Sequence, residues 1–274
     1  MVDNNITINE SFIVVLDSRN ATNYLNGTFN SSVLFNFYNP IRVKNNSVSM
    51  SCGLSSFSCP NSIYNINETN SLLSLTVNSI TTNYDIMYGT YDVNTFMTQL
   101  ISQIGSNFTI SLNNITNKLT LVNSLYNFSI NSNSTIYNIM GFTSLISISS
   151  TNKTLIMPYM CNFNGLASLN IVIQNFNMNN LSSYNQSDTP IIQSVSINPV
   201  SSIITYNKSN DFKFIINDAT LTYLQIDIMD DLENLINFNN QYFNLTLEFT
   251  EIINIDKYHY VETFDSILKN GYNK

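Results

Sequence analysis

The chain has 274 residues, enough to bury a large core in one β-sandwich with an insertion or in two smaller domains. Its net charge is −8, only 10% of its residues are charged and Lys and Arg do not cluster, which argues against direct nucleic-acid binding and anionic membranes. No apolar run is long enough for a transmembrane segment, and the polar, acidic start MVDNNITINE does not have the features of a signal peptide.

The first part of the chain has the composition and turn punctuation of β-strands. Strands are predicted at 11–16, 33–38, 41–50 and 71–80, each bounded by clusters of Asn, Ser, Gly and Pro. Pro40 lies between the second and third of these segments. Proline has no N–H for a ladder hydrogen bond, so this position favours a bulge or an edge over a central strand.

The hydrophobic period changes from two to about 3.6 after Asp92, which is a suitable N-cap for a helix over 93–104. Gly105 follows as a stop signal. Such an apolar stripe usually packs on a neighbouring element. The elements predicted next are a hairpin at 108–112 and 118–123, a strand at 128–130 and a short helix at 134–140 ended by Gly141.

The β pattern returns after a polar linker at 144–154. Five more strands are predicted, at 155–160, 168–176, 191–197, 201–206 and 211–216. A hairpin is predicted over 222–249, because two runs there alternate cleanly between apolar and polar residues. The apolar faces of these runs, expected to seal the core, are Leu224, Ile226 and Ile228, and then Phe243, Leu245, Leu247 and Phe249.

The predicted fold class is mainly all-β, a jelly-roll-like antiparallel β-sandwich with a small inserted α+β unit. The sandwich is assigned to residues 1–83 and 144–250, the insert to 84–143, and a C-terminal tail or arm to 251–274. Val261, Phe264, Ile267 and Leu268 form a helical stripe in that tail. Two separate β-domains are the alternative organisation.

The sequence indicates no catalytic, cofactor-binding or metal-binding residues. His259 is the only histidine, so a two-histidine metal site is excluded, and we interpret it as a solvated tail residue rather than the base of a triad. The densest acidic group is Asp227, Asp230, Asp231 and Glu233. It lacks the spacing of a calcium loop, and we interpret it as solvated loop charge rather than a hydrolase site.

The cysteines and glycines are equally uninformative about catalysis. Cys52, Cys59 and Cys161 fit neither a disulfide framework nor a zinc pattern and are expected to be free thiols from a reducing compartment. No GxGxxG, P-loop or GxSxG motif occurs. We therefore expect no enzyme activity and no cofactor.

Several segments, in their order, resemble a known family. They are FYNPI and SMS near the start, Tyr88–Asp92 opening the helix, the hairpin FTISLNNITNKLTLVN, Ile139–Phe142, and the run from Ile226 to Phe249 with its LINFN and LTLEF motifs. Over roughly 10–250 the chain resembles the jelly-roll minor capsid proteins, penton proteins included, of polintons, virophages and giant DNA viruses. Glu233-Asn234 replaces a turn that more often contains Gly, and Asn237 replaces a common Asp.

The resemblance implies a structural, non-enzymatic virion protein located in the capsid and synthesised in the cytoplasm of an infected host cell. Its implied partners are further copies of itself in a cyclic homo-oligomer, a pentamer at a five-fold vertex, and the major capsid protein. The resemblance implies no functional site residues. A jelly-roll lectin or adhesin that binds a host-surface glycan is the alternative function, and a hydrolase using the acidic group is a third.

Overall fold

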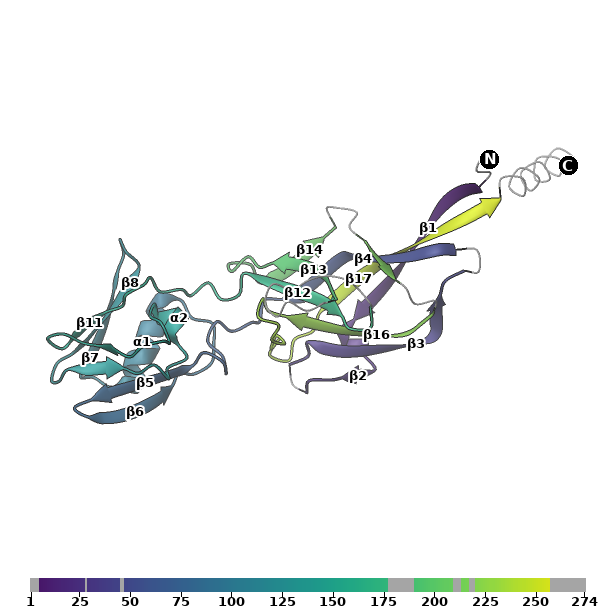
Figure 1. The fold of residues 1–274 in the computed structure, drawn as a ribbon. Helices are drawn as coiled ribbons and strands as arrows, with labels where there is room; N and C mark the ends of the chain where they lie inside the picture. Colours follow the sequence, from purple (N-terminus) through teal and green to yellow (C-terminus); the bar gives the residue numbers. More distant parts are fainter. Residues whose placement is uncertain are drawn as a thin grey trace, which may run out of the picture. The chain divides into compact units, whose positions relative to one another are not determined.

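The computed structural model describes residues 5–27, 29–44, 47–176, 190–208, 213–216 and 220–256. The chain divides into two compact units, shown as a ribbon in Figure 1. Unit 1 combines Met1–Ser62 with Ala167–Lys274, and unit 2 is the intervening Ile63–Leu166. Each unit has its own sheets, so they are described separately. Among the described residues no helix is long and apolar enough to cross a membrane.

Unit 1 consists mainly of two antiparallel sheets. The first has the order β1-β17-β4-β14, and β15 pairs with another part of β4. Its strands are β1 (Asn5–Asp17), β4 (Ser47–Pro60), β14 (Ile203–Asn207), β15 (Phe214–Ile216) and β17 (Asn244–Asp256). The second has the order β13-β12-β16-β3-β2. Its strands are β2 (Asn23–Tyr24), β3 (Ser32–Arg42), β12 (Ser168–Ile173), β13 (Ile191–Ser196) and β16 (Thr220–Met229).

The strand order of unit 1 is that of a jelly roll. If the two-residue β2 is left out and β14 and β15 are taken as one interrupted strand, the described strands number eight. The first sheet then holds the first, eighth, third and sixth strands, and the other holds the fifth, fourth, seventh and second. This is the double Greek-key arrangement of a jelly roll. The predicted all-β fold class is therefore confirmed, and unit 2 is inserted between the third and fourth strands.

The hairpin predicted over 222–249 is wrong, although both of its strands exist. β16 and β17 lie in different sheets and do not pair with each other. The connection between them is long enough to pass from one sheet to the other. It buries Ile236 and Phe238, and Ile236 donates its N–H to the Ile228 carbonyl at 3.0 Å. The apolar faces predicted for the two strands are confirmed, and they meet in the sandwich core.

The core of unit 1 is built from the inward faces of the two sheets. Fully buried members include Val33, Met50, Phe57, Leu224, Ile226, Ile228, Phe238, Phe243, Leu245, Leu247 and Phe249. Phe243 stacks at a tilt against Phe57, with ring centroids 6.0 Å apart, and also against Phe238 at 6.1 Å. Each such side chain contributes about 1.5–3 kcal/mol by leaving water.

Unit 2 is an α+β unit with its own apolar core. A four-stranded sheet contains β5 (Leu72–Val77), β6 (Ile80–Asp85), β9 (Phe128–Ile130) and β10 (Ile148–Ser149). A three-stranded sheet contains β7 (Phe108–Asn113), β8 (Lys118–Asn123) and β11 (Thr154–Ile156). The helices are α1 (Val93–Ile104) and the single-turn α2 (Tyr137–Met140).

The helix α1 forms where the sequence predicts it. The Asp92 carboxylate accepts the Thr95 N–H at 2.8 Å while the Thr95 hydroxyl accepts the Asp92 N–H at 3.0 Å, a reciprocal capping box. Its stripe of Phe96, Leu100 and Ile104 is buried, and the helix packs beside β7. At the end of α2, Gly141 has φ +86°, and a Cβ there would lie 2.7 Å from the Met160 carbonyl oxygen. Only glycine fits this position.

The insert is wider than the predicted 84–143, so the predicted division of the sandwich into 1–83 and 144–250 is corrected. The segment 71–80 does not join the jelly roll, because β5 pairs with β6 and β9. Residues 155–160 do not belong to the sandwich either, because β11 pairs with β8 in unit 2. Alternation of apolar and polar residues identifies a strand, but it does not show in which of the two cores the apolar face packs.

Several strand boundaries also differ from the prediction. The chain stays extended through Pro40 as far as Arg42, and the β16–β3 register shifts in this region, which matches the expected bulge. The second half of β4, SCGLSSFSCP, was not predicted because small polar residues hide its period. β17 continues through Asp256, into the predicted tail. The rest of that tail, including its helical stripe and His259, lies outside the described residues.

Candidate assembly surface

The acidic group is divided between a strand and the turn that follows it, and one member departs from the prediction. Asp227 lies on β16 and is 5% exposed, so its interpretation as a solvated loop charge is wrong. Its Oδ1 accepts the Ser32 hydroxyl at 2.6 Å, and its Oδ2 accepts the Gln174 amide at 2.7 Å. These bonds satisfy both carboxylate oxygens within the second sheet. Asp227 therefore ties three adjacent segments together.

The remaining acidic residues belong to the turn after β16. The Asp230 Oδ1 accepts the N–H groups of Leu232 and Asn234 at 2.9 and 2.8 Å, and Oδ2 accepts the Asn234 side-chain amide at 3.0 Å. Asp230 thus closes its own turn. Asp231 is exposed, and Glu233 has φ +64°, as a residue in a tight turn does. In the parts of the chain that the structure describes, no cluster of His, Cys, Asp and Glu suits a metal ion.

The cysteines are free, as predicted, and two are buried in β4. Burial raises the pKa of the Cys59 thiol to about 12 and the pKa of Cys52 further still. Burial also raises the pKa of Cys161, in unit 2. Each thiol is therefore protonated at neutral pH, which makes it a poor nucleophile.

The outer side of β1 is a long edge of the first sheet of the jelly roll. β1 pairs with β17 over 13 residues in an unbroken register from Asn5↔Asp256 to Asp17↔Asn244. No described strand pairs with the other side of β1, so its outward N–H and C=O groups have no strand partner among the described residues. Figure 1 shows β1 beside β17. Such an edge is a template for pairing with another chain.

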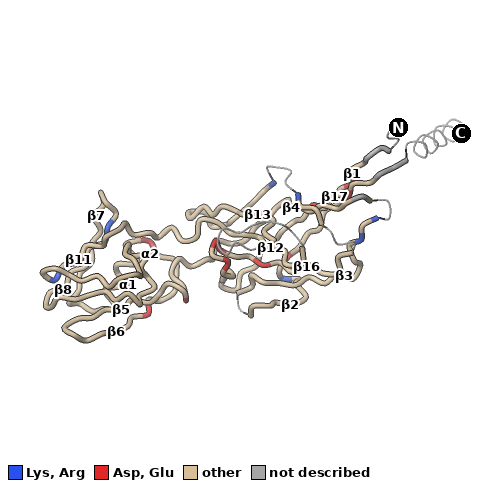
Figure 2. The backbone as a smooth tube through the Cα atoms, in the orientation of Figure 1, with Lys and Arg blue, Asp and Glu red and all other residues tan. Residues whose placement is uncertain are grey.

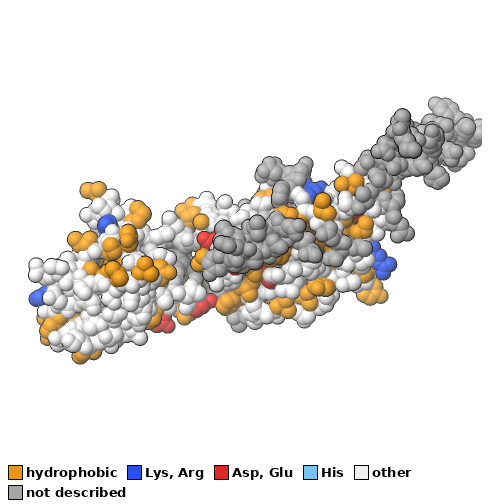
Figure 3. Space-filling view, viewed as in Figure 1, with side chains coloured by type: hydrophobic (Ala, Val, Ile, Leu, Met, Phe, Trp, Pro, Cys, Tyr) orange, Lys and Arg blue, Asp and Glu red, His pale blue; other side chains and the backbone are white. Residues whose placement is uncertain are grey.

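The side chains of this edge are apolar in its central part. Ile13 and Val15 are 62% and 69% exposed, whereas Leu16 points to the other face and is buried. Phe12 stacks on Phe249 with ring centroids 5.3 Å apart, and part of its ring is in solvent. Figure 2 shows that few of the described residues are charged, and in Figure 3 the described part of the visible face is mostly white with separate orange areas.

The usual protections of an edge strand are missing from this stretch. Between Glu10 and Asp17 the strand has no charged residue, no proline and no break in register. The opposite edge of the same sheet differs, because β14 and β15 are short and pair with separate parts of β4. Lys208 and Lys213 lie near it, each 2.7 Å from a carboxylate oxygen of Glu248. Short strands and lysines are common ways to block edge pairing.

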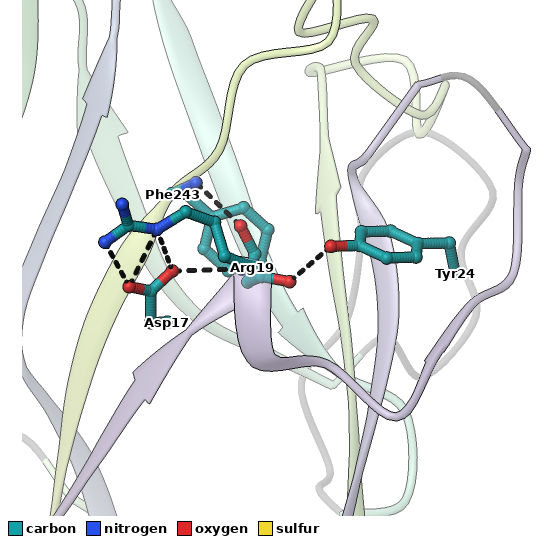
Figure 4. Close-up of polar contacts among 5 residues, drawn as sticks. Asp17, Arg19, Tyr24 and Phe243 are labelled. Atoms are coloured by element: carbon teal, nitrogen blue, oxygen red, sulfur yellow. Dashed lines mark hydrogen bonds and ion pairs between the residues drawn. The ribbon is translucent and has the colours of Figure 1, made fainter.

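The C-terminal end of β1 is fixed by a compact set of polar contacts (Figure 4). Ser18 and Phe243 exchange hydrogen bonds: the Ser18 N–H donates to the Phe243 carbonyl at 2.9 Å, and the Phe243 N–H donates to the Ser18 hydroxyl at 2.9 Å. The Tyr24 hydroxyl donates to the Ser18 carbonyl at 2.8 Å. Arg19 binds Asp17 through its guanidinium, which lowers the pKa of that carboxyl. These hydrogen bonds therefore fix the position of β1 at its C-terminal end.

The other part of β1 carries a carboxylate pair bridged by a lysine. Glu10 and Glu251 are directly opposite each other in the β1–β17 register, an arrangement that is repulsive by itself. Lys44 contacts the Glu10 carboxylate, and its Nζ lies 3.8 Å from Glu251 Oε2. Its bond to Glu10 raises the pKa of Lys44. The positive charge of Lys44 offsets the repulsion between these two carboxylates.

The chain was compared with known proteins. No family model and no curated protein matches it. Among solved structures it is similar to the crystal structure of the mavirus penton protein, with a TM-score of 0.47 and 11% identity, over 90% of this chain and 99% of that one. At that similarity the name of the matched protein carries no function over to this chain.

Proposed function

We propose that this chain is a structural virion protein, a minor capsid or penton-type protein that builds or caps an icosahedral vertex through protein–protein contacts. It would be synthesised in the cytoplasm of an infected host cell and located in the capsid. The order of the sequence motifs supports this role, as does a jelly-roll topology of the kind found in viral capsid proteins. The observation that carries the proposal is the unprotected edge of β1 on that jelly roll.

The proposed partners are further copies of the chain, in a cyclic homo-oligomer that we take to be a pentamer, and the major capsid protein. A ring requires a heterologous contact, in which one surface of a copy meets a different surface of the next. The β1 edge is suited to one side of that contact. Each backbone hydrogen bond made there would contribute about 0.5–1.5 kcal/mol. Ile13 and Val15 would each add up to about 1.5–3 kcal/mol on full burial.

The direct test is electron microscopy of the purified full-length chain and of virions that contain it. We expect closed rings of the isolated protein, and density for unit 1 at the vertices of the shell. A monodisperse monomer, together with virions that lack this density at the vertices and beneath the shell, would contradict the proposal.

The alternative function is a lectin or adhesin that binds a host-surface glycan, because jelly rolls also occur in lectin domains. A glycan array separates the two functions. We expect no glycan to bind at millimolar concentration. Specific binding by a monomeric chain would favour the lectin and count against the capsid role.

A further inference from the structure

The chain contains two Asn-Gly pairs in its described part, and their asparagines are in different environments. Asn26-Gly27 lies between β2 and β3, and Asn164-Gly165 lies at the end of unit 2, just before the chain returns to unit 1. Both glycines have similar left-handed backbones, with φ +63° and +68°. The two glycines thus have matched backbone conformations, and the two asparagine side chains can be compared directly.

The two side-chain amides differ in what holds them. The Asn26 Nδ2 donates to the Ser31 hydroxyl at 3.0 Å, and its Oδ1 accepts the Ser32 N–H at 3.4 Å. Asn164 is exposed, and within the described residues its side chain makes no hydrogen bond. Only its backbone N–H is bound, by Asn162 Oδ1 at 3.0 Å. The Asn164 side chain is therefore free to rotate toward the next peptide group.

The residue before Asn164 is held by ring packing and a hydrogen bond, whereas the residue after it is not held in this way by any described residue. Phe163 packs against Phe96 with ring centroids 5.1 Å apart, and its carbonyl accepts the Asn65 amide at 2.8 Å. Beyond it, the Gly165 N–H makes no hydrogen bond within the described part of the chain. Glycine has no Cβ to hinder the approach of its backbone nitrogen to a neighbouring group. A reactive amide and an accessible nucleophilic nitrogen therefore lie next to each other.

We propose that Asn164-Gly165 is a site of spontaneous deamidation in the folded protein. The Gly165 nitrogen attacks Asn164 Cγ and forms a C–N bond, the Cγ–Nδ2 bond breaks, and ammonia leaves with the proton from Gly165. Water then opens the succinimide at either carbonyl and yields aspartate or isoaspartate. The product adds one negative charge near the C-terminal end of unit 2, and isoaspartate also adds a methylene to the backbone there.

Peptide mapping of the full chain, aged at mildly alkaline pH, tests this inference independently of capsid function. The readouts are the mass increase at each Asn-Gly peptide and enzymatic methylation of isoaspartate. We expect Asn164 to react several-fold faster than Asn26 in the folded protein, and the rates to converge in denaturant. Equal rates in the folded protein, or a faster reaction at Asn26, would overturn the proposal.

Two variants make the result specific. Gly165→Ala should slow the reaction at Asn164 several-fold, because the added methyl hinders the attacking nitrogen. Ser31→Ala removes the acceptor of the Asn26 Nδ2 and leaves only the long bond from the Ser32 N–H, so it should accelerate the reaction at Asn26, with Asn164 unchanged. Hydrogen exchange on each variant checks that both units remain folded. An unchanged rate at Asn164 in folded Gly165→Ala would also contradict the proposal.

Discussion

Unit 1 and unit 2 differ in the length of their edge strands and in whether they bury charged side chains. The strands of unit 2 are at most six residues long, and its buried side chains are apolar or neutral within the described residues. Unit 1 buries Asp227 and Glu251, and the outer side of its 13-residue edge strand has no partner among the described strands. Short edges protect a domain from association, whereas a long open edge favours it. This difference supports the proposal that unit 1, rather than unit 2, carries the association surface.

The largest effect that we expect comes from placing a charge in the core of unit 1. Leu245, 1% exposed, pairs with Leu16 on one side and Phe57 on the other. Leu245→Asp buries an unpaired carboxylate and should cost at least about 4 kcal/mol, enough to prevent unit 1 from folding. Ile226→Asp, in the other sheet, should do the same.

Hydrogen exchange is the measurement for these variants. Protection should be lost across β4 and β17 but kept at Leu119 and Leu121 in unit 2. Asn244→Lys, at an exposed position next to Leu245 and opposite Asp17, is the control and should fold normally. A folded, assembled double variant Leu245→Asp/Ile226→Asp would refute the assignment of these faces to the core.

The reciprocal experiment weakens unit 2 alone. Phe96 is fully buried and contacts Tyr91 edge-on, with ring centroids 6.3 Å apart. Phe96→Ala should cost about 3–5 kcal/mol because it leaves a cavity in the core of unit 2. Calorimetry should show one transition shifting to lower temperature while that of unit 1 stays in place. If both transitions shift equally, the two units are not independent.

A smaller loss is expected at the buried carboxylate that distinguishes unit 1. Asp227→Ala leaves the Ser32 hydroxyl and the Gln174 amide without their acceptor and should cost about 1–3 kcal/mol. Chemical denaturation monitored by tyrosine fluorescence measures this loss. Asp227→Leu should be at least as damaging, since neither polar partner is satisfied. Equal stability of Asp227→Ala and the parent chain would mean that these bonds make no net contribution.

The smallest effect concerns acid stability. The bonds from Lys208 and Lys213 lower the pKa of Glu248 in the folded state below the ordinary value of about 4.3. The stability that this group contributes is fully present above the unfolded pKa and is lost as pH falls through the folded pKa. Thermal unfolding against pH should therefore show unit 1 weakening below about pH 4.3.

Matched variants separate this effect in the two units. Glu248→Gln should lower the stability of unit 1 at neutral pH and flatten its acid dependence. Asp92→Asn should act on unit 2 only, because Thr95 lowers the pKa of Asp92 there through the capping box. An unchanged acid profile of unit 1 in Glu248→Gln would remove Glu248 as a cause.

The sequence predicts elements better than their partners. Alternation identified the inward faces of β16 and β17, and Asp92 and Gly105 marked the ends of α1 correctly. The pattern of β5 would look the same in either core, so local signals could not assign it to unit 2. Burial of Asp227 depends on Ser32, which is 195 residues away in sequence. Nor does alternation distinguish an edge strand from a central one, so the open side of β1 emerged only from the sheet order.

The most direct test of the central claim is the oligomeric state of the full chain with a charged β1 edge. Native mass spectrometry should detect a closed homo-oligomer for the parent chain and a folded monomer for Ile13→Lys/Val15→Lys. The lysines leave the core intact but oppose strand pairing. Ile80→Lys, at a similarly exposed position in unit 2, is the matched control and should assemble normally. A double variant that assembles as well as the parent chain would contradict the claim that β1 is the assembly edge.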